Sequence, residues 1–294
     1  MRLRRTALIA PLLLLAAAGC APADSDGKAA SEPTTTATSS SGTADACATD
    51  SLPTKTAGKL TVGTDSPAYE PWFSDNDPSN GKGFESAVAY AVADKLGFAK
   101  DAVSWVKVPF NNSYAPGAKA FDFDINQISI TPDREKVVDF SQPYYTATQA
   151  VVTLKKNAGK ASSLADLKKL KLGAQTGTTS LTAVRQIVKP DKEPLVFNDS
   201  NTPKQALLNG QVDAVVFDLP TAFYITAAEI EGSTITGQFS GEGVEGDRFG
   251  LLFEKGNKLR DCVDQAIDEL TSDGTLAALE KQWLSDVVDV PVLQ

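Results

Sequence analysis

From Leu60 onward the sequence alternates between two kinds of hydrophobic pattern, and this alternation limits the folds open to the chain. Short apolar runs such as Val103–Val108 and Val212–Phe217 predict strands, and longer stretches with one apolar face, such as Gly83–Leu96 and Lys258–Ser272, predict helices. Strands separated by helices of this length predict βαβ units with mostly parallel sheets. Ligands in such sheets bind beyond the carboxyl ends of the strands, so the residues that follow the strands are the first candidates for a site.

The N-terminal segment 1–20 has the features of an export signal and lies outside the predicted fold. Three arginines precede an apolar run, Thr6–Ala18, that is too short to span a membrane. The Gly-Cys ending at Cys20 resembles a bacterial lipobox, in which the cysteine is diacylated and becomes the new N-terminus. We therefore expect a lipoprotein signal peptide, lipidation of Cys20 and a lipid anchor on the cell membrane. An ordinary secretory signal cleaved near Ala18 is the alternative.

Composition sets further bounds on the rest of the chain. Residues 21–57 are rich in Ala, Ser, Thr, Asp, Gly and Pro and predict a flexible tether. Residues 58–294 are long enough for one large domain or two smaller lobes. The formal net charge is −9 and the chain contains no histidine. These facts exclude His-based catalysis and most zinc sites and argue against nucleic acid as a partner, so we expect neither a metal nor a cofactor.

Two cysteines remain once Cys20 is assigned to lipidation. In an oxidising compartment an even pair forms a disulfide more often than it leaves two free thiols, so we expect a bridge between Cys47 and Cys262. A buried Cys262 and an exposed Cys47 are the alternative.

The segment around Arg134 carries the clearest binding chemistry. Polar residues at a predicted strand end, Asn126, Gln127 and Ser129, are followed by a Thr-Pro turn and then by Arg134. Backbone N–H groups, a hydroxyl and a guanidinium fork within a few residues suit the binding of a small carboxylate. A surface arginine after a turn is the alternative.

Two further places in the sequence point to the same kind of ligand. Gly177-Thr178-Thr179 opens a predicted helix, where free N–H groups and the helix dipole attract an anion, although a plain N-cap is the alternative. Asp218 follows the predicted strand Val212–Phe217 and offers a carboxylate to an ammonium group, with capping of the next helix as its alternative. A carboxylate and an ammonium group on one carbon define an α-amino acid.

The chain resembles the family 3 extracytoplasmic solute-binding proteins of ABC transporters, the polar amino-acid-binding group, from about Lys59 to Leu284. The motifs that carry the resemblance stand in the family's order: LTVGTD, GFES followed by ADKLG, QISITPDR followed by VDFSQPYY, SLADLKKLKLGAQTGTT, NGQVDAVVFDLP and TSDGTLAALEKQWL. The resemblance implies two α/β lobes with mostly parallel central sheets, joined by two hinge strands in the type II periplasmic-binding-protein arrangement. Lobe 1 is then 58–148 plus 247–294, and lobe 2 is 149–246.

The resemblance also implies roles for individual residues. Arg134 and Ser129 bind the ligand carboxylate, Thr178 and Thr179 add N–H donors to it, and Asp218 binds the ammonium group. The side-chain pocket takes an aspartate and aromatic residues. The predicted ligand-binding residues are Asp65, Tyr69, Phe110, Asn126, Gln127, Ser129, Arg134, Thr178, Thr179 and Asp218.

The departures from the family pattern lie near the side-chain end of this site. Asn126 and Gln127 stand where serine or glycine is usual, and Asp124 lies in a strand that is usually apolar. One residue is inserted before Tyr69, so Tyr69 and Trp72 compete for the aromatic role, with packing as the expected role of Trp72.

These expectations define one function. The chain is expected to be a monomeric, membrane-anchored, extracytoplasmic binding component of an amino-acid ABC importer that closes around its ligand, delivers it to the permease and catalyses no reaction. The pocket motifs contain the acids Asp65, Glu70 and Asp124 and no cation besides Arg134, which favours a neutral polar or cationic amino acid. The alternatives are a dehydratase-type enzyme on the same scaffold, a ligand-sensing domain or a structural envelope lipoprotein.

Overall fold

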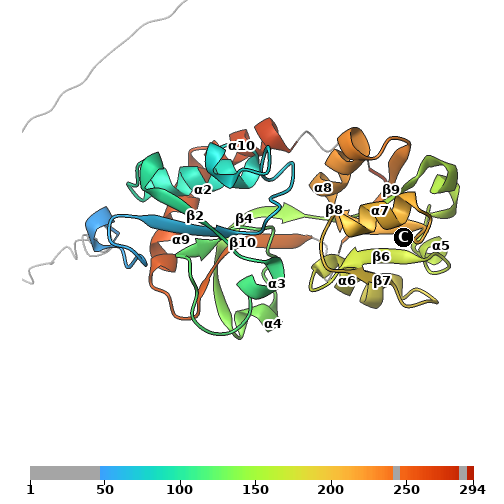
Figure 1. Cartoon of the computed structure of the whole chain (residues 1–294), viewed down its shortest axis with the longest axis horizontal. Coiled ribbons are helices and arrows are strands. Elements are labelled where there is room, and N and C mark those ends of the chain that lie inside the picture. The colour runs from blue at the N-terminus through green and yellow to red at the C-terminus, as the bar shows by residue number, and fades with distance from the viewer. Residues whose placement is uncertain (1–46, 241–245, 285–289) are drawn as a thin grey trace, which may run out of the picture. The chain divides into compact units, whose positions relative to one another are not determined.

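The structure, a computed structural model, describes residues 47–240, 246–284 and 290–294. All of them fall in one compact unit, Ser40–Gln294. Two five-stranded sheets form its framework, with strand orders β2-β1-β3-β10-β4 and β7-β6-β8-β5-β9 (Figure 1). The predicted α/β fold with two lobes is therefore confirmed.

In each sheet four strands run in one direction and the fifth, β10 in the first sheet and β5 in the second, runs against them. The parallel parts are β2-β1-β3 and β7-β6-β8, and the remaining pairings of β10 and of β5 are antiparallel. The sheets are thus mixed, and with four of five strands in one direction in each, the prediction of mostly parallel sheets is confirmed. The strands are β1 (Leu60–Thr64), β2 (Val103–Lys107), β3 (Phe123–Asp124), β4 (Val138–Ala147), β5 (Gln149–Leu154), β6 (Leu172–Gln175), β7 (Leu195–Phe197), β8 (Ala214–Asp218), β9 (Ser233–Phe239) and β10 (Asp247–Glu254).

The strands that form the antiparallel pairings of β10 and of β5 are the ones that connect the two sheets. Strand β4 ends at Ala147 in the first sheet, and β5 begins at Gln149 in the second. The chain returns from β9 in the second sheet to β10 in the first. These two crossings correspond to the hinge strands that were predicted.

The central strands of the second sheet are apolar on both faces because helices cover both faces. On β5, Ala150 and Val152 join one hydrophobic cluster, and Val151 between them joins the other. On β8, Val215 and Val216 divide between the same two clusters. The period of two therefore buries every side chain instead of exposing alternate ones.

Helices surround the two sheets. In the first lobe, α2, α9 and α10 pack on one another, and their apolar residues share one cluster with aromatic side chains of the first sheet. The α-helices are α2 (Phe84–Lys95), α3 (Phe110–Ser113), α4 (Pro132–Glu135), α5 (Leu164–Leu167), α6 (Thr179–Ala183), α7 (Thr202–Leu208), α8 (Leu219–Tyr224), α9 (Leu259–Ser272) and α10 (Thr275–Trp283). The 3-10 helices are η1 (Thr49–Ser51), η2 (Pro78–Asn80), η3 (Lys100–Ala102) and η4 (Lys155–Lys160), and the π-helical segments are η5 (Val184–Val188) and η6 (Ile225–Glu229).

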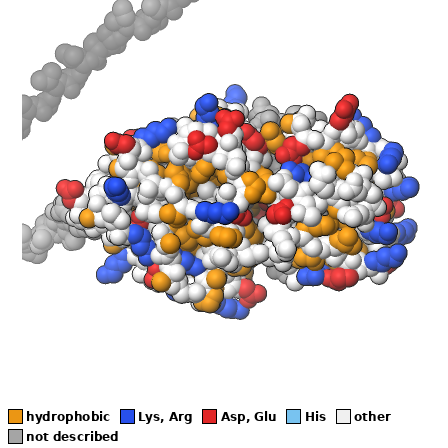
Figure 2. Space-filling model, in the orientation of Figure 1, with side chains coloured by type: hydrophobic (Ala, Val, Ile, Leu, Met, Phe, Trp, Pro, Cys, Tyr) orange, Lys and Arg blue, Asp and Glu red, His pale blue; other side chains and the backbone are white. Residues whose placement is uncertain are grey.

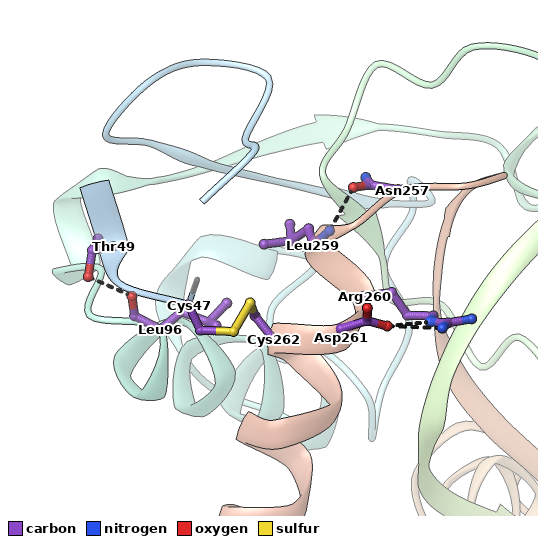
Figure 3. Close-up of a disulfide and its surroundings, with 8 residues drawn as sticks. All are labelled: Cys47, Thr49, Leu96, Asn257, Leu259, Arg260, Asp261 and Cys262. Atoms are coloured by element: carbon purple, nitrogen blue, oxygen red, sulfur yellow. Dashed lines mark hydrogen bonds and ion pairs between the residues drawn. A yellow bond between two sulfur atoms is a disulfide. The ribbon is translucent and has the colours of Figure 1, made fainter. Parts of the chain in front are cut away.

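The predicted tether is too long at its C-terminal end, because Cys47 and the residues after it pack on the first lobe. Cys47 forms the expected disulfide with Cys262 of α9, and the Thr49 hydroxyl donates to the Leu96 carbonyl at 2.9 Å (Figure 3). Leu52 is buried. The rest of the predicted tether, the signal segment and Cys20 lie outside the described residues.

The C-terminal residues belong with the second sheet, although the prediction assigned them to lobe 1. The N–H of Leu293 donates to the carbonyl of Gln238 on β9, and the Leu293 side chain is buried in a cluster of the second lobe. The N–H of Leu164 donates to the carbonyl of Gln294. Leu293 is buried against the sheet that lies nearer to the chain end in space. The order of residues in the sequence does not show which of the two sheets is nearer.

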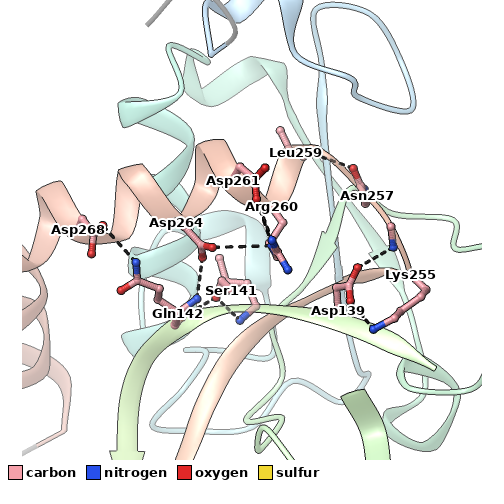
Figure 4. Close-up of polar contacts among 12 residues, drawn as sticks. Asp139, Ser141, Gln142, Lys255, Asn257, Leu259, Arg260, Asp261, Asp264 and Asp268 are labelled. Atoms are coloured by element: carbon pink, nitrogen blue, oxygen red, sulfur yellow. Dashed lines mark hydrogen bonds and ion pairs between the residues drawn. The ribbon is translucent and has the colours of Figure 1, made fainter. Parts of the chain in front are cut away.

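Polar contacts tie α9 and the end of β10 to β4 in the first lobe (Figure 4). The N–H of Gln142 donates to Asp264 Oδ1 at 2.6 Å, and Lys255 Nζ lies 2.7 Å from Asp139 Oδ1. These contacts hold β4 in place on the stretch that leads to the first crossing.

Candidate functional site

A cavity lies between the two sheets and is lined by residues of both lobes. Its empty volume is about 830 Å³, including the part that is open to solvent. Every predicted ligand-binding residue except Arg134 lines it. These residues are Asp65, Tyr69, Phe110, Asn126, Gln127, Ser129, Thr178, Thr179 and Asp218.

Arg134 lies buried beside the cavity and joins the two lobes. Its Nη1 donates to the Ser129 carbonyl at 2.7 Å, and its Nη2 donates to the Gly177 carbonyl at 2.8 Å. The guanidinium carbon is 4.5 Å from the ring centroid of Tyr114 and 5.6 Å from that of Phe110. Burial lowers the pKa of this guanidinium, but an arginine starts from so high a value that it keeps its charge.

Hydroxyl groups from both lobes meet next to Arg134. Ser129 Oγ lies 3.2 Å from Thr179 Oγ1. The hydroxyl of Thr178 accepts from the N–H of Leu181 and so caps α6, which is the alternative role considered for this residue. Gly177 has φ 74°, in the left-handed region that favours glycine, and a Cβ there would meet the side chains of Asn111 and Tyr114. A larger residue here would strain the backbone and displace these two side chains of the first lobe.

Asp218 presents a carboxylate at the end of β8. Gln149 Nε2 donates to Asp218 Oδ1 at 2.8 Å and also to Asp247 Oδ2 at 2.7 Å. Burial, and then the nearby Asp247, raise the pKa of Asp218 to about 7. Its side chain makes no capping hydrogen bond to α8, so the helix-cap alternative does not describe it. A cationic group in the cavity would stabilise the charged form of this carboxylate.

Tyr69 and Trp72, the two candidates for the aromatic role, both line the cavity. Trp72 packs edge-on against Phe249 with ring centroids 5.8 Å apart, as expected of a packing residue. Its Nε1 also donates to Thr221 Oγ1 of α8 at 2.8 Å, which links the lobes. Burial, followed by nearby carboxylates, raises the pKa of Tyr69 to about 12.

Two further predicted residues hold each other in the wall of the first lobe. Asp65 accepts from the N–H of Ser66 at 2.6 Å and from the N–H of Phe110 at 3.2 Å. Phe110 also lines the cavity, and its ring lies 5.6 Å from the guanidinium carbon of Arg134.

Two buried acids stand behind this wall. Glu85 accepts from the N–H of Gln127 at 2.7 Å, from the Gln127 side chain and from the Tyr144 hydroxyl, and burial raises the pKa of Glu85 to about 7. Gln127 has φ 48°, so these bonds hold a left-handed residue in the cavity wall. Asp124 is fully buried and neither carboxylate oxygen has a hydrogen-bond partner among the described residues. Burial, Glu85 and Asp65 raise the pKa of Asp124 well above its ordinary value.

Comparison with known proteins places the chain in a family. Residues 60–286 match the model of the bacterial extracellular solute-binding proteins, family 3. The chain belongs to this family. It is 31% identical over 231 residues to the L-cystine-binding protein TcyJ of Escherichia coli (strain K12), which covers 78% of this chain and 84% of that protein.

Solved structures agree with this assignment. An ancestral arginine-binding protein bound to arginine is 34% identical to this chain, with a TM-score of 0.66. The match covers 78% of this chain and 99% of that protein. The ancestral amino acid-binding protein AncCDT-1, described as a precursor of cyclohexadienyl dehydratase, is 31% identical, with a TM-score of 0.65 and coverage of 78% and 96%. Within the described residues of this solute-binding protein, no helix is long and apolar enough to cross a membrane.

The solute-binding protein also has cavity residues that were not predicted. The expectation of no cation besides Arg134 is wrong, because Lys204 of α7 lines the cavity. Its Nζ lies 2.7 Å from Glu229 Oε2 and 5.6 Å from the centroid of the Tyr69 ring. Lysines in the first turn of a helix are usually exposed, so no local pattern distinguishes this one. The glutamate of the GFES motif, Glu85, could have been found as a charge within an apolar helix.

Proposed function

We propose that this solute-binding protein binds a free α-amino acid in the cavity between its lobes. The observation that carries the proposal is Asp218, a carboxylate that faces the cavity with its pKa raised to about 7. Such a group gains from a ligand ammonium, because the paired charge offsets the desolvation that burial imposes. Arg134 and the hydroxyls of Ser129 and Thr179 stand beside the cavity as partners for the ligand carboxylate.

Binding to both lobes would favour a closed form. The proposed ammonium partner, Asp218, comes from the second lobe, whereas Ser129 and Arg134 come from the first. A ligand that contacts both walls contributes free energy to the closed form and little to an open one. A shift from about 1% to about 99% closed requires roughly 5.5 kcal/mol of differential binding. Several charge-assisted hydrogen bonds of about 1.5–3 kcal/mol each supply energy of this order.

The charges of the cavity support a neutral polar or cationic amino acid. Four carboxylates line it, from Asp65, Glu70, Asp218 and Glu229, against the single lysine Lys204. An acidic side chain would meet repulsion from most of these groups. Relatives whose names specify L-cystine and arginine, neither of which is an acidic amino acid, agree with this preference.

The proposed setting follows from the N-terminal sequence and the family. Cys20 would carry the lipid anchor, residues 21–46 would serve as the tether, and the monomeric protein would deliver its ligand to the permease of an ABC importer outside the cytoplasm. No residue of the cavity is assigned a catalytic role.

A thermal-shift screen tests the proposed function directly. The chain 21–294 is heated with each common amino acid, because a ligand that binds the native state raises the melting temperature by mass action. We expect a large shift with at least one amino acid, none with its decarboxylated or deaminated analogue, and loss of the shift in Asp218→Asn. The absence of any shift with every amino acid would contradict the proposal.

The ancestral relative described as a precursor of a dehydratase gives a second candidate some support. A dehydratase would turn over a cyclic carboxylate and would have no ammonium to pair with Asp218. Release of water from such a substrate, with no amino acid bound, would favour the enzyme over the binding protein.

A further inference from the structure

The cavity contains one pair of opposite charges that the amino and carboxylate groups of a single amino-acid head, bound at Asp218, would leave unmatched. Lys204 and Glu229 line the cavity and lie 2.7 Å apart. The Lys204 side chain is only 10% exposed, and that of Glu229 is 32% exposed. A lysine so deeply buried is uncommon, and its partner Glu229 keeps access to solvent.

The ammonium of Lys204 has bonding capacity left for a ligand. It has three N–H donors, and its hydrogen bond to Glu229 Oε2 is the one it makes within the described residues. The Tyr69 ring of the first lobe faces it at 5.6 Å. A carboxylate docked here would contact Lys204 from the second lobe while lying against Tyr69 from the first.

The cavity is long enough for this pair to be separate from Asp218. The residues Asp218, Thr221, Ile225 and Glu229 all line it and follow one another at spacings of a helical face along α8 and η6. At roughly 1.5 Å of rise per residue, the backbone from Asp218 to Glu229 spans about 15 Å. Asp218 and the pair Lys204–Glu229 therefore lie toward opposite ends of this row of lining residues.

The combination of charges narrows the ligand class, and this step rests on the proposed function. A purely cationic side chain would pair with Glu229 but would be repelled by Lys204 beside it. A purely acidic side chain would pair with Lys204 but would be repelled by Glu229 and Glu70. A side chain that ends in both an ammonium and a carboxylate satisfies both members of the pair.

We propose that Lys204 and Glu229 form a second amino-acid-head subsite, so that the cavity binds a diaminodicarboxylic acid with one head at Asp218 and the other at Lys204 and Glu229. Two amino acids joined through a disulfide have α-carbons roughly 5.5–6 Å apart, and carbon-linked analogues are of similar length. Because the side chains of Asp218 and Glu229 extend into the cavity from both ends of this row of residues, a ligand of this size spans the distance that remains.

Three matched ligands test the subsite on the chain 21–294 by isothermal titration calorimetry. L,L-diaminosuberate has both heads, L-homolysine lacks the second carboxylate, and L-aminosuberate lacks the second ammonium. We expect L,L-diaminosuberate to bind at least about tenfold more tightly than either analogue, since each lost charge-assisted contact costs that factor or more.

Two variants then test the contributions of Lys204 and Glu229 one at a time. Lys204→Met should weaken L,L-diaminosuberate and L-aminosuberate about tenfold and leave L-homolysine unchanged or tighter. Glu229→Gln should weaken L,L-diaminosuberate and L-homolysine and spare L-aminosuberate. Lys192→Met, at an exposed lysine of the same lobe, should change none of the three. Melting of each variant without ligand shows that it is folded.

The outcomes distinguish the subsite from the proposed function. If L-homolysine binds as tightly as L,L-diaminosuberate, or if Lys204→Met weakens all three ligands equally, the second subsite is overturned while amino-acid binding stands. If none of the three ligands and no common amino acid binds, the proposed function itself fails.

Discussion

In the first sheet the parallel strands β2-β1-β3 are followed by β10 and β4, and in the second sheet β7-β6-β8 are followed by β5 and β9. The two lobes thus repeat one arrangement, but their cores differ. The first core is rich in aromatic rings, such as Trp72, Phe84 and Phe249, whereas the cores of the second are mainly aliphatic. On the face seen in Figure 2, acidic side chains lie among the basic ones on both lobes.

The two lobes also give the cavity different chemistry. The first lobe contributes aromatic faces, Asp65 and the adjoining Arg134, and the second contributes Asp218 together with the pair Lys204 and Glu229. The same strand order can therefore carry different sites, because a sheet fixes where the loops begin and leaves their residues free. Variants at the buried charges of each wall, and at the hydrogen bond between Trp72 and Thr221 across the walls, should separate the two contributions.

The largest effect concerns the stability of the first wall. Burial raises the pKa of Glu85 from 4.5 to about 7. Between these pH values the folded protein holds a proton that the unfolded chain has lost, so the free energy of unfolding falls as the pH rises through this window, by up to about 3 kcal/mol from this group. Glu85→Gln should flatten that dependence in urea unfolding at pH 4.5 and pH 7. An unchanged difference between the two pH values would contradict this role.

The next effect tests the link between the walls. Arg134→Met removes the guanidinium that donates to the carbonyls of Ser129 and Gly177. We expect amino-acid affinity to fall about 100-fold, because a buried charge-assisted contact of roughly 1.5–3 kcal/mol is lost. Arg134→Lys keeps the charge without the fork and should lie in between. Calorimetry that shows wild-type affinity for Arg134→Met would rule out its role at the ligand carboxylate.

The protonation of Asp218 should change the ligand affinity by about tenfold per pH unit below its pKa. Its pKa is about 7 without ligand, and a bound ammonium group lowers it, so binding below pH 7 must release a proton. Affinity should be level above about pH 7 and fall as the pH drops below it. Titration in two buffers of different ionisation enthalpy measures the proton release. Residual binding by Asp218→Asn should lack this dependence.

The smallest effect comes from the hydrogen bond between Trp72 Nε1 and Thr221 Oγ1 across the lobes. Trp72→Phe and Thr221→Val should each weaken ligand binding about fivefold, since a neutral hydrogen bond contributes roughly 1 kcal/mol. The double variant should be little weaker than either single one. Independent, additive losses would show that the bond does not couple the two walls.

The sequence was a good guide for polar residues at predicted strand ends. Ser129 and Asp218 were predicted from their places at strand ends, and both line the cavity. Arg134 was predicted to offer its guanidinium fork to a ligand carboxylate. Two of its nitrogens also bond to backbone carbonyls, and the bond to Gly177 depends on the approach of the two lobes. Lys204 was missed because its partner, Glu229, is distant in the sequence.

The sequence alone determined the alternation of strands and helices and the family, because periodicity and motif order can be read along the chain. The even number of cysteines left after Cys20 predicted the pairing of Cys47 with Cys262, and nine of the twenty residues that line the cavity were predicted. Tertiary structure decided which charges meet. Glu229 is placed beside Lys204, Gln127 is held by Glu85, and Asp124 is left without a hydrogen-bond partner among the described residues. Burial and distance set the energies of charged groups, and both depend on how the lobes fold against each other.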